Sequence, residues 1–196
     1  IPQGLVLLTS SVLAISTARL ARRSVLIQQF YCIEMLARVD VLCLDKTGTI
    51  TSGSMDFEKS VGVDGHDSSE VELAAAAIVH ASAHDANETA TALIRHAAEV
   101  GIVAPEPARA IGFSSARKYS GCVLADGRSL VMGAAQFVFS NGVPDSVSKA
   151  LSQAGERART LVVAECDGFD KDGSLIGLAR PLGILSLSDH IRSSAP

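Results

Sequence analysis

Val39-Asp40-Val41-Leu42-Cys43-Leu44-Asp45-Lys46-Thr47-Gly48-Thr49 is the stretch of sequence on which the fold prediction rests. It begins as a short apolar run and ends on a carboxylate, followed by a turn that contains glycine. This pattern is typical of a buried parallel strand at its carboxyl end. Ligands of open α/β sheets gather at the carboxyl ends of the strands. We therefore expect Asp45 to lie where chemistry takes place.

The composition excludes several classes of protein. A chain of 196 residues with 47% hydrophobic content can bury one good core or two small ones, which predicts a globular protein. Its net charge of -4 and pI near 5.7 provide no basic face for phosphate neutralisation, so we expect no nucleic-acid partner. The four cysteines are far apart and include no Cys-x-x-Cys pair. Neither a zinc site nor a disulfide framework is indicated, and a reducing cytoplasm fits.

Residues 1–18 are apolar or small and uncharged, and Arg19, Arg22 and Arg23 follow them. The run is slightly shorter than the about 20 residues that span a bilayer, which favours the cytoplasmic end of a membrane helix. A buried helix of a soluble domain fits equally well. The positive charges follow the apolar run, so a secretory signal peptide is excluded. The chain opens without Met, and we expect it to be a piece of a longer protein.

The remaining sequence predicts an inserted domain of mixed helices and strands. Residues 52–67 are weakly patterned and suggest a linker or hinge. Ser69-Glu70-Val71-Glu72 has the spacing of a capping box, and Asn87 is placed to cap a second helix that Gly101 ends. The other expected elements are a hairpin over 121–133 turning at Asp126-Gly127, a helix over 144–154, and strands over 160–164, 175–178 and 184–187.

Asp45-Lys46-Thr47-Gly48-Thr49, extended by Ile50-Thr51, resembles the phosphorylation motif of P-type ATPases. Residues 1–5 and 36–40 are most similar to the bacterial calcium- or magnesium-type pumps of that family. The resemblance implies an α/β fold: a partial haloacid-dehalogenase-like (Rossmann-like) phosphorylation domain with an inserted α+β nucleotide-binding domain, an antiparallel sheet flanked by helices. The cytoplasmic end of a transmembrane helix precedes it. The implied boundaries are 1–35 for the helix end and stalk, 36–52 for the first part of the phosphorylation domain, 53–180 for the nucleotide-binding domain, and 181–196 for the return.

The resemblance assigns the chemistry of phosphate transfer to three residues. Asp45 would accept the γ-phosphate of ATP as an aspartyl-phosphate, a covalent strategy known for ATPases. Hydroxyls of Thr47 and Thr49 would bond the phosphoryl oxygens, and Mg²⁺ (magnesium) would be held by Asp45 and the Thr47 carbonyl. Soluble phosphatases of this fold carry a second aspartate at the position of Thr47, and a threonine cannot replace that acid and base. Thr47 therefore favours a pump over a haloacid-dehalogenase-like phosphatase, which is kept as an alternative. A non-transporting nucleotide-binding module is another alternative.

The resemblance also implies an ATP pocket in the inserted domain. Phe113 would stack on adenine and Lys118 would approach the nucleotide, although a core phenylalanine beside a solvated basic pair is the simpler alternative. Glu88 would lie near adenine, but helix capping explains it nearly as well. Arg159 would reach the phosphates.

One family motif is incomplete in this chain. Gly133 and Ala134 would let the nucleotide come close, but Met132 stands where the family has a lysine. The loss of that positive charge is expected to weaken ATP binding.

The resemblance implies that the longer protein to which this fragment would belong is a cation pump of the cell membrane. This fragment would lie mostly on the cytoplasmic side. Calcium-type pumps carry a glutamate ligand where this chain has Gln3, and an amide is a weaker ligand for a hard cation. Calcium or magnesium is the cation that the sequence favours. The fragment alone is expected to be inactive, because the family's later catalytic segments are not in it.

Overall fold

The structure is a computed structural model and describes residues 3–44, 51–85, 87–155 and 158–191. The chain divides into two compact units, Ile1–Leu44 and Asp45–Pro196.

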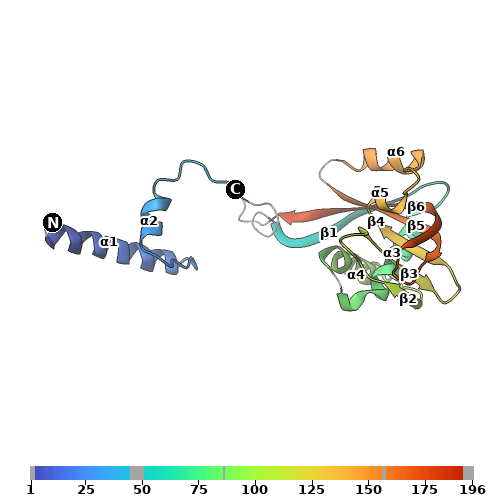
Figure 1. Cartoon of the computed structure of the whole chain (residues 1–196), viewed down its shortest axis with the longest axis horizontal. Helices are drawn as coiled ribbons and strands as arrows, with labels where there is room; N and C mark the ends of the chain where they lie inside the picture. The colour runs from blue at the N-terminus through green and yellow to red at the C-terminus, as the bar shows by residue number, and fades with distance from the viewer. Residues whose placement is uncertain (1–2, 45–50, 86, 156–157, 192–196) are drawn as a thin grey trace. The chain divides into compact units, whose positions relative to one another are not determined.

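The first unit contains two helices, α1 over Gln3–Ala21 and α2 over Tyr31–Leu36, and no residue of either helix is buried (Figure 1). By length and composition, α1 is able to cross a membrane. Its polar side chains bond within the helix, as when the Thr9 hydroxyl donates to the Leu5 carbonyl at 3.0 Å. A hydroxyl bonded in this way does not require water. These features agree with a membrane span, whereas the helix of a soluble core would be mostly buried and no described residue of α1 is.

Residues 39–44 form no strand, so the strand predicted before Asp45 is wrong for the part of the chain that the structure describes. Val41 and Leu42 are 79% and 74% exposed. A buried parallel strand needs neighbours at its edges and cover on its faces. The six strands of the described residues pair with one another and not with this segment. Among the residues that the structure describes, the apolar run has no partner strand.

The second unit is built on one antiparallel sheet, which confirms the expected α+β domain of a sheet flanked by helices. Its strands follow the order β1-β6-β5-β4-β3-β2, with every neighbouring pair antiparallel. The predicted hairpin is confirmed as β3 and β4, and Gly127 in its turn has a φ of 91°. The strands are β1 (Thr51–Gly62), β2 (Pro107–Ile111), β3 (Tyr119–Leu124), β4 (Ser129–Gly133), β5 (Arg159–Phe169) and β6 (Leu175–Ile191).

Strands β1 and β6 differ from the sequence expectation. Residues 52–62 belong to β1 rather than to a linker, and the two strands predicted over 175–178 and 184–187 are parts of β6. Ile184 and Leu185 are fully buried within it. A Cβ at Gly183 would lie 2.3 Å from the Val61 carbonyl oxygen, so the two backbones approach closely there. The sheet therefore continues past residue 180, where we expected the nucleotide-binding domain to end.

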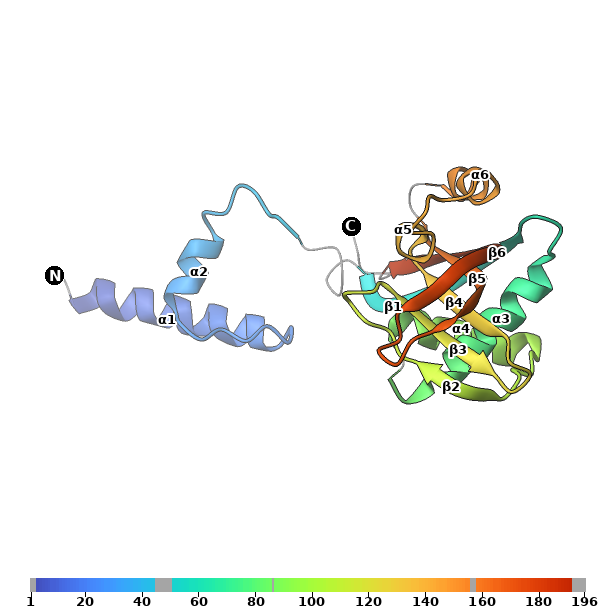
Figure 2. The ribbon, with the colours of Figure 1, turned by 45° about the vertical axis from the view of Figure 1, so that its right-hand side comes forward.

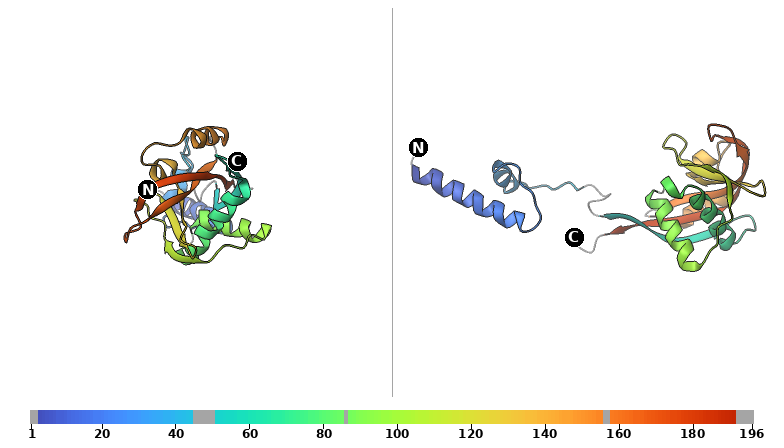
Figure 3. Two further views of the ribbon diagram at one scale, coloured as in Figure 1. Left: turned by 90° about the vertical axis from the view of Figure 1, so that its right-hand side faces the viewer. Right: turned by 90° about the horizontal axis from the view of Figure 1, so that it is seen from below.

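Helices cover both faces of the sheet (Figures 2 and 3). One cover consists of α3 and α4, whose Val71, Ile78 and Leu93 enter a core with Leu185. The other consists of α5 and α6, which enter a second core. Burying each aliphatic side chain contributes roughly 1.5–3 kcal/mol. The helices are α3 (Ser68–Ala81), the 3₁₀ helix η2 (Ala83–Asp85), α4 (Glu88–Val100), α5 (Ala135–Val138) and α6 (Asp145–Gln153).

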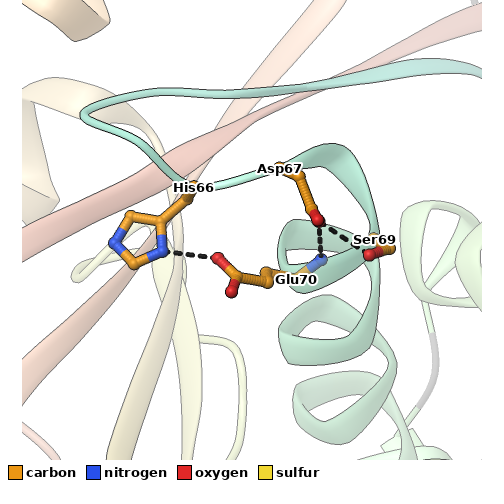
Figure 4. A network of polar contacts seen from close by, with 4 residues as sticks. All are labelled: His66, Asp67, Ser69 and Glu70. Carbon is orange, nitrogen blue, oxygen red and sulfur yellow. Dashed lines mark hydrogen bonds and ion pairs between the residues drawn. The ribbon is translucent and has the colours of Figure 1, made fainter.

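Side-chain caps fix the first turns of α3 and α4. Asn87 accepts a hydrogen bond from the Ala90 amide, and Gly101 ends α4 at a φ of 78°, as predicted. The cap of α3 is Asp67 and not the predicted capping box at Ser69. The Asp67 carboxylate accepts from the Glu70 amide at 3.0 Å and from the Ser69 hydroxyl at 2.6 Å (Figure 4). These two bonds lower the pKa of Asp67, with the Ser69 hydroxyl as the larger cause.

Candidate functional site: a pocket at the end of helix α3

A pocket opens on the face of the sheet that α3 and α4 cover. Its empty volume is about 540 Å³ when the open mouth is included. The walls come from the end of α3, the start of α4, strands β3 to β5 and the turn before β3. The lining residues are Ile78, Val79, Ser82, Asn87, Thr89, Ala90, Phe113, Lys118, Ser120, Met132, Gly133, Arg159 and Leu161.

Four of the residues predicted to bind nucleotide meet at this pocket: Phe113, Lys118, Gly133 and Arg159. They come from three separate segments of the chain. Phe113 is 48% exposed, so the ring is available for contact and is not a core residue. No acidic residue is among the described residues that line the pocket, whereas Lys118 and Arg159 are cations. The pocket therefore favours an anionic ligand, although the chain as a whole is acidic.

Lys118 is held by backbone contacts on both sides. Its φ is 58°, in the left-handed region that costs energy for a residue with a side chain. Its amide donates to the Ser114 carbonyl at 2.7 Å, and its own carbonyl accepts from the Ala134 amide at 3.1 Å. A Cβ at Gly133 would lie 2.5 Å from that carbonyl oxygen, so glycine is required where β4 comes this close to residue 118.

Arg159 and Thr89 share a buried partner behind the pocket. The Thr89 hydroxyl donates to Met55 Sδ at 3.4 Å, and Arg159 Nη1 donates to the same sulfur at 3.6 Å. Met55 is 2% exposed and belongs to β1. A thioether is a weak acceptor, so these contacts orient the two side chains more than they stabilise the fold.

Two of the predicted residues do not line the pocket, Glu88 and Ala134. Ala134 is the N-cap residue of α5. Glu88 stands in the first turn of α4, between the lining residues Asn87 and Thr89. Its Oε1 would lie 3.5 Å from a Cβ placed on Gly53, which directs the carboxylate towards the start of β1.

Several lining residues escaped the sequence reasoning, namely Ser82, Thr89 and Ser120. Ser82 and Thr89 lie at the end of α3 and the start of α4, and no motif in the sequence marked them. Ser120 lies in β3, two residues after Lys118, and this closeness in sequence could have identified it. Ser82 Oγ is buried with no hydrogen-bond partner among the residues that the structure describes.

The residues expected to accept phosphate and bind magnesium, Asp45, Thr47 and Thr49, lie outside the described residues. Among those described, no three side chains of His, Cys, Asp or Glu are grouped to hold a metal ion.

Burial raises the pKa of the Cys122 thiol to about 12 and that of Cys166 to about 11. Both thiols are neutral near pH 7 and are not nucleophiles.

The arrangement of the second unit matches known structures. A zinc-transporting PIB-type ATPase in its E2.Pi state has a TM-score of 0.64 at 22% identity, over 95% of this chain and 28% of that one. The catalytic domain of the CPx-ATPase CopB-B has a TM-score of 0.55 at 17% identity, over 91% of this chain and 56% of that one. A curled antiparallel sheet flanked by helices is the fold of the P-type ATPase nucleotide-binding domain, and this chain has that fold.

Sequence relatives give the family. A probable cation-transporting ATPase of Streptococcus pneumoniae is 33% identical over 195 residues, covering 100% of this chain and 25% of the relative. The calcium-transporting ATPase CtpE of Mycobacterium bovis is 33% identical over 202 residues, and a copper-exporting P-type ATPase of Mycobacterium tuberculosis is 28% identical over 194. They match 100% and 99% of this chain and 24% and 23% of their own lengths. No family model matches the chain. The homologues of this chain are P-type cation-transporting ATPases that match it over its whole length, and the chain spans about a quarter of the length of these curated relatives.

Proposed function

We propose that the pocket binds ATP and that the chain is the nucleotide-binding segment of an ATP-driven cation pump. The observation that carries this proposal is the convergence of Phe113, Lys118 and Arg159 on one pocket. A half-exposed ring offers a face on which a base can stack, and the two cations offer partners for the phosphates. Glu88 would act from the rim, while Gly133 and Ala134 would shape the backbone beside the nucleotide.

The phosphate acceptor of the intact pump is proposed to be Asp45, on the strength of the sequence motif. Thr47 and Thr49 would bond the transferring phosphoryl group, and Mg²⁺ would be held by Asp45 and the Thr47 carbonyl. Thr47 also disfavours the phosphatase alternative, because it cannot supply the acid and base that hydrolyse the phosphoenzyme. Radiolabel from γ-labelled ATP should appear on the intact protein and be absent in Asp45→Asn; undiminished labelling of that variant would exclude Asp45.

Transport and location are proposals as well. The parent protein would lie in the cell membrane with this segment on the cytoplasmic side, in agreement with the long apolar helix α1. The relatives and similar structures include calcium, copper and zinc transporters by name, so a preference for calcium or magnesium rests on the sequence alone. The segment by itself would bind ATP without turning it over.

The nucleotide proposal is tested by comparing two exposed aromatic residues. Phe113→Ala removes the ring from the pocket, and Phe137→Ala removes a ring that is 40% exposed on α5 and does not line the pocket. Loss of one base stack costs roughly 1–3 kcal/mol, so ATP affinity should fall about 5- to 150-fold in Phe113→Ala. The measurement is titration of the 196-residue chain with ATP, followed by NMR shift perturbation.

Phe137→Ala should keep the affinity of the unaltered chain. Unchanged affinity in Phe113→Ala, with a native-like spectrum, would remove the stacking role and with it the pocket assignment. Equal losses in the two variants would mean that the aromatic residues support the fold rather than the nucleotide.

A further inference from the structure

The side chain of Arg117 joins two turns that are far apart in the sequence. Its Nη2 donates to the Gly112 carbonyl at 3.1 Å, directly before Phe113, and its Nη1 donates to the Asp172 carbonyl at 2.8 Å. The guanidinium carbon also lies 5.9 Å from the centre of the Tyr119 ring. Arg117 does not itself line the pocket. It ties the turn that carries two pocket residues to the turn between β5 and β6.

The β5–β6 turn is a firm anchor. The Asp170 amide donates to the Ser174 carbonyl at 2.9 Å, and the Ser174 amide donates to the Asp170 carboxylate at 2.7 Å. The Tyr119 hydroxyl donates to the Gly173 carbonyl at 3.3 Å, which fastens this turn to β3. A Cβ on Gly173 would lie 3.3 Å from the Arg117 guanidinium, so glycine leaves the room that Arg117 occupies.

The pocket turn, residues 112–118, needs such an anchor. Phe113 is half exposed, so core packing does not fix its ring. Lys118 has a positive φ, a conformation that persists only where surrounding contacts enforce it. Arg117 lies next to Lys118 and holds the carbonyl next to Phe113, so a single guanidinium restrains both ends of the turn. Its rigid planar fork bonds the two carbonyls from two separate nitrogens, whereas a lysine has a single ammonium nitrogen.

We propose that Arg117 is a positioning residue for nucleotide binding: by clamping residues 112–118 to the β5–β6 turn, it presents Phe113 and Lys118 to the pocket. The proposal rests on the proposed ATP site and adds a residue that acts on it without touching the ligand.

Arg109 provides a matched control. It donates to the Phe169, Asp170 and Lys171 carbonyls at 3.4, 2.6 and 3.2 Å, so it holds the same β5–β6 turn. None of these hydrogen bonds of Arg109 reaches residues 112–118 in the part of the chain that the structure describes. Arg117→Met and Arg109→Met therefore remove similar bonds from one turn, and only the first releases the pocket turn.

ATP titration of the 196-residue chain should separate the two variants. Arg117→Met should lower the affinity about tenfold, the scale of one or two lost hydrogen bonds, and Arg109→Met by less than about twofold. Arg117→Lys, which can keep one of the two bonds, should fall between Arg117→Met and the unaltered chain. Equal losses in the two Met variants, or no loss in Arg117→Met, would overturn the proposal.

A double-mutant cycle tests whether Arg117 acts through Phe113. If the clamp presents the ring, Arg117→Met should cost well below tenfold in the Phe113→Ala background, because the ring that it positions is already absent. Full additivity of the two losses would overturn the proposal. If Arg117→Met fails to fold by circular dichroism, the same cycle is run with Arg117→Lys, where a partial reduction of the Phe113 effect is expected.

Hydrogen exchange separates failure of this inference from failure of the ATP proposal, because it needs no nucleotide. Amides of residues 112–118 should exchange faster in Arg117→Met than in Arg109→Met. If the unaltered chain binds no ATP, the proposed function fails, and faster exchange would still support the clamp. Equal exchange rates of residues 112–118 in the two variants would contradict the clamp, whether or not the chain binds ATP.

Discussion

The two units of the chain contain similar apolar runs and use them differently. Val41 and Leu42 of the first unit are 79% and 74% exposed, whereas Ile184 and Leu185 of the second are fully buried. The second pair lies in β6 between two partner strands, β1 and β5, with helices over both faces. The first pair has no partner strand among the described residues. An apolar run becomes a strand where the fold supplies neighbours, and the run alone does not decide it.

The largest effect should come from truncating the buried run. Ile184→Ala leaves a cavity in the core and should lower the free energy of unfolding by about 2–5 kcal/mol. Leu42→Ala, at an exposed position, should change it by less than about 0.5 kcal/mol. Guanidinium denaturation followed by circular dichroism measures both. A loss in Leu42→Ala as large as in Ile184→Ala would show that the first unit is also stabilised by packing, and the contrast would disappear.

A smaller effect should follow from removing a helix cap in the second unit. The Asn87 side chain accepts from the Ala90 amide at 2.9 Å, whereas Phe30, the N-cap residue of α2 in the first unit, makes no side-chain cap hydrogen bond. Asn87→Ala should destabilise the fold by about 1 kcal/mol. Asn141→Ala, in an exposed turn, is the control and should be close to neutral. Thermal unfolding of both variants checks this, and a neutral Asn87→Ala would contradict the cap.

The smallest expected effect is a change in the stability of the fold at acidic pH. Because Asp67 has a lowered pKa in the folded state, its charge adds stability above the ordinary value of 3.8, and this is lost as the pH falls through the lowered pKa. Asp67→Asn keeps a capping oxygen but carries no charge. The difference in melting temperature between the unaltered chain and Asp67→Asn should therefore be constant above the ordinary value and vanish below the lowered one. A difference that persists unchanged at pH 2 would mean that the Asp67 charge is not responsible.

Local signals in the sequence predicted local structure well. The Asp126-Gly127 turn, the Asn87 cap and the end of α4 at Gly101 each depend on a few adjacent residues. The sequence prediction divided β6 into two strands, and Pro181 lies between the two predicted parts. In the structure the β5–β6 register shifts where Ala164 faces Pro181, and such an irregularity is where a strand tolerates proline.

The long edge strand β1 was missed for a related reason. Its register against β6 shifts twice, between Thr51 and Met55 and between Phe57 and Lys59. Each shift breaks the alternation of apolar and polar side chains that marks a strand in sequence. The segment therefore resembled a linker.

The candidate site could be predicted in part. Phe113, Lys118 and Arg159 were found by their resemblance to family motifs, and the structure brings them to one pocket. Spacing could not show that Met55, in a strand taken for a linker, lies behind Arg159 and Thr89. Arg117 stood inside a motif that was already recognised, but its role depends on a turn more than fifty residues later.

The pairing of β1 with β6 has a consequence for how the sheet unit can be joined to other protein. Thr51 faces Ile191 across this pair, so the chain enters and leaves the unit at neighbouring points. A host protein can accept such a unit between two adjacent residues with little distortion of either partner. Two strands bonded side by side also resist separation and twisting better than a single strand does. Both ends of the unit therefore lie in paired strands at one edge of the sheet, Thr51 in β1 and Ile191 in β6.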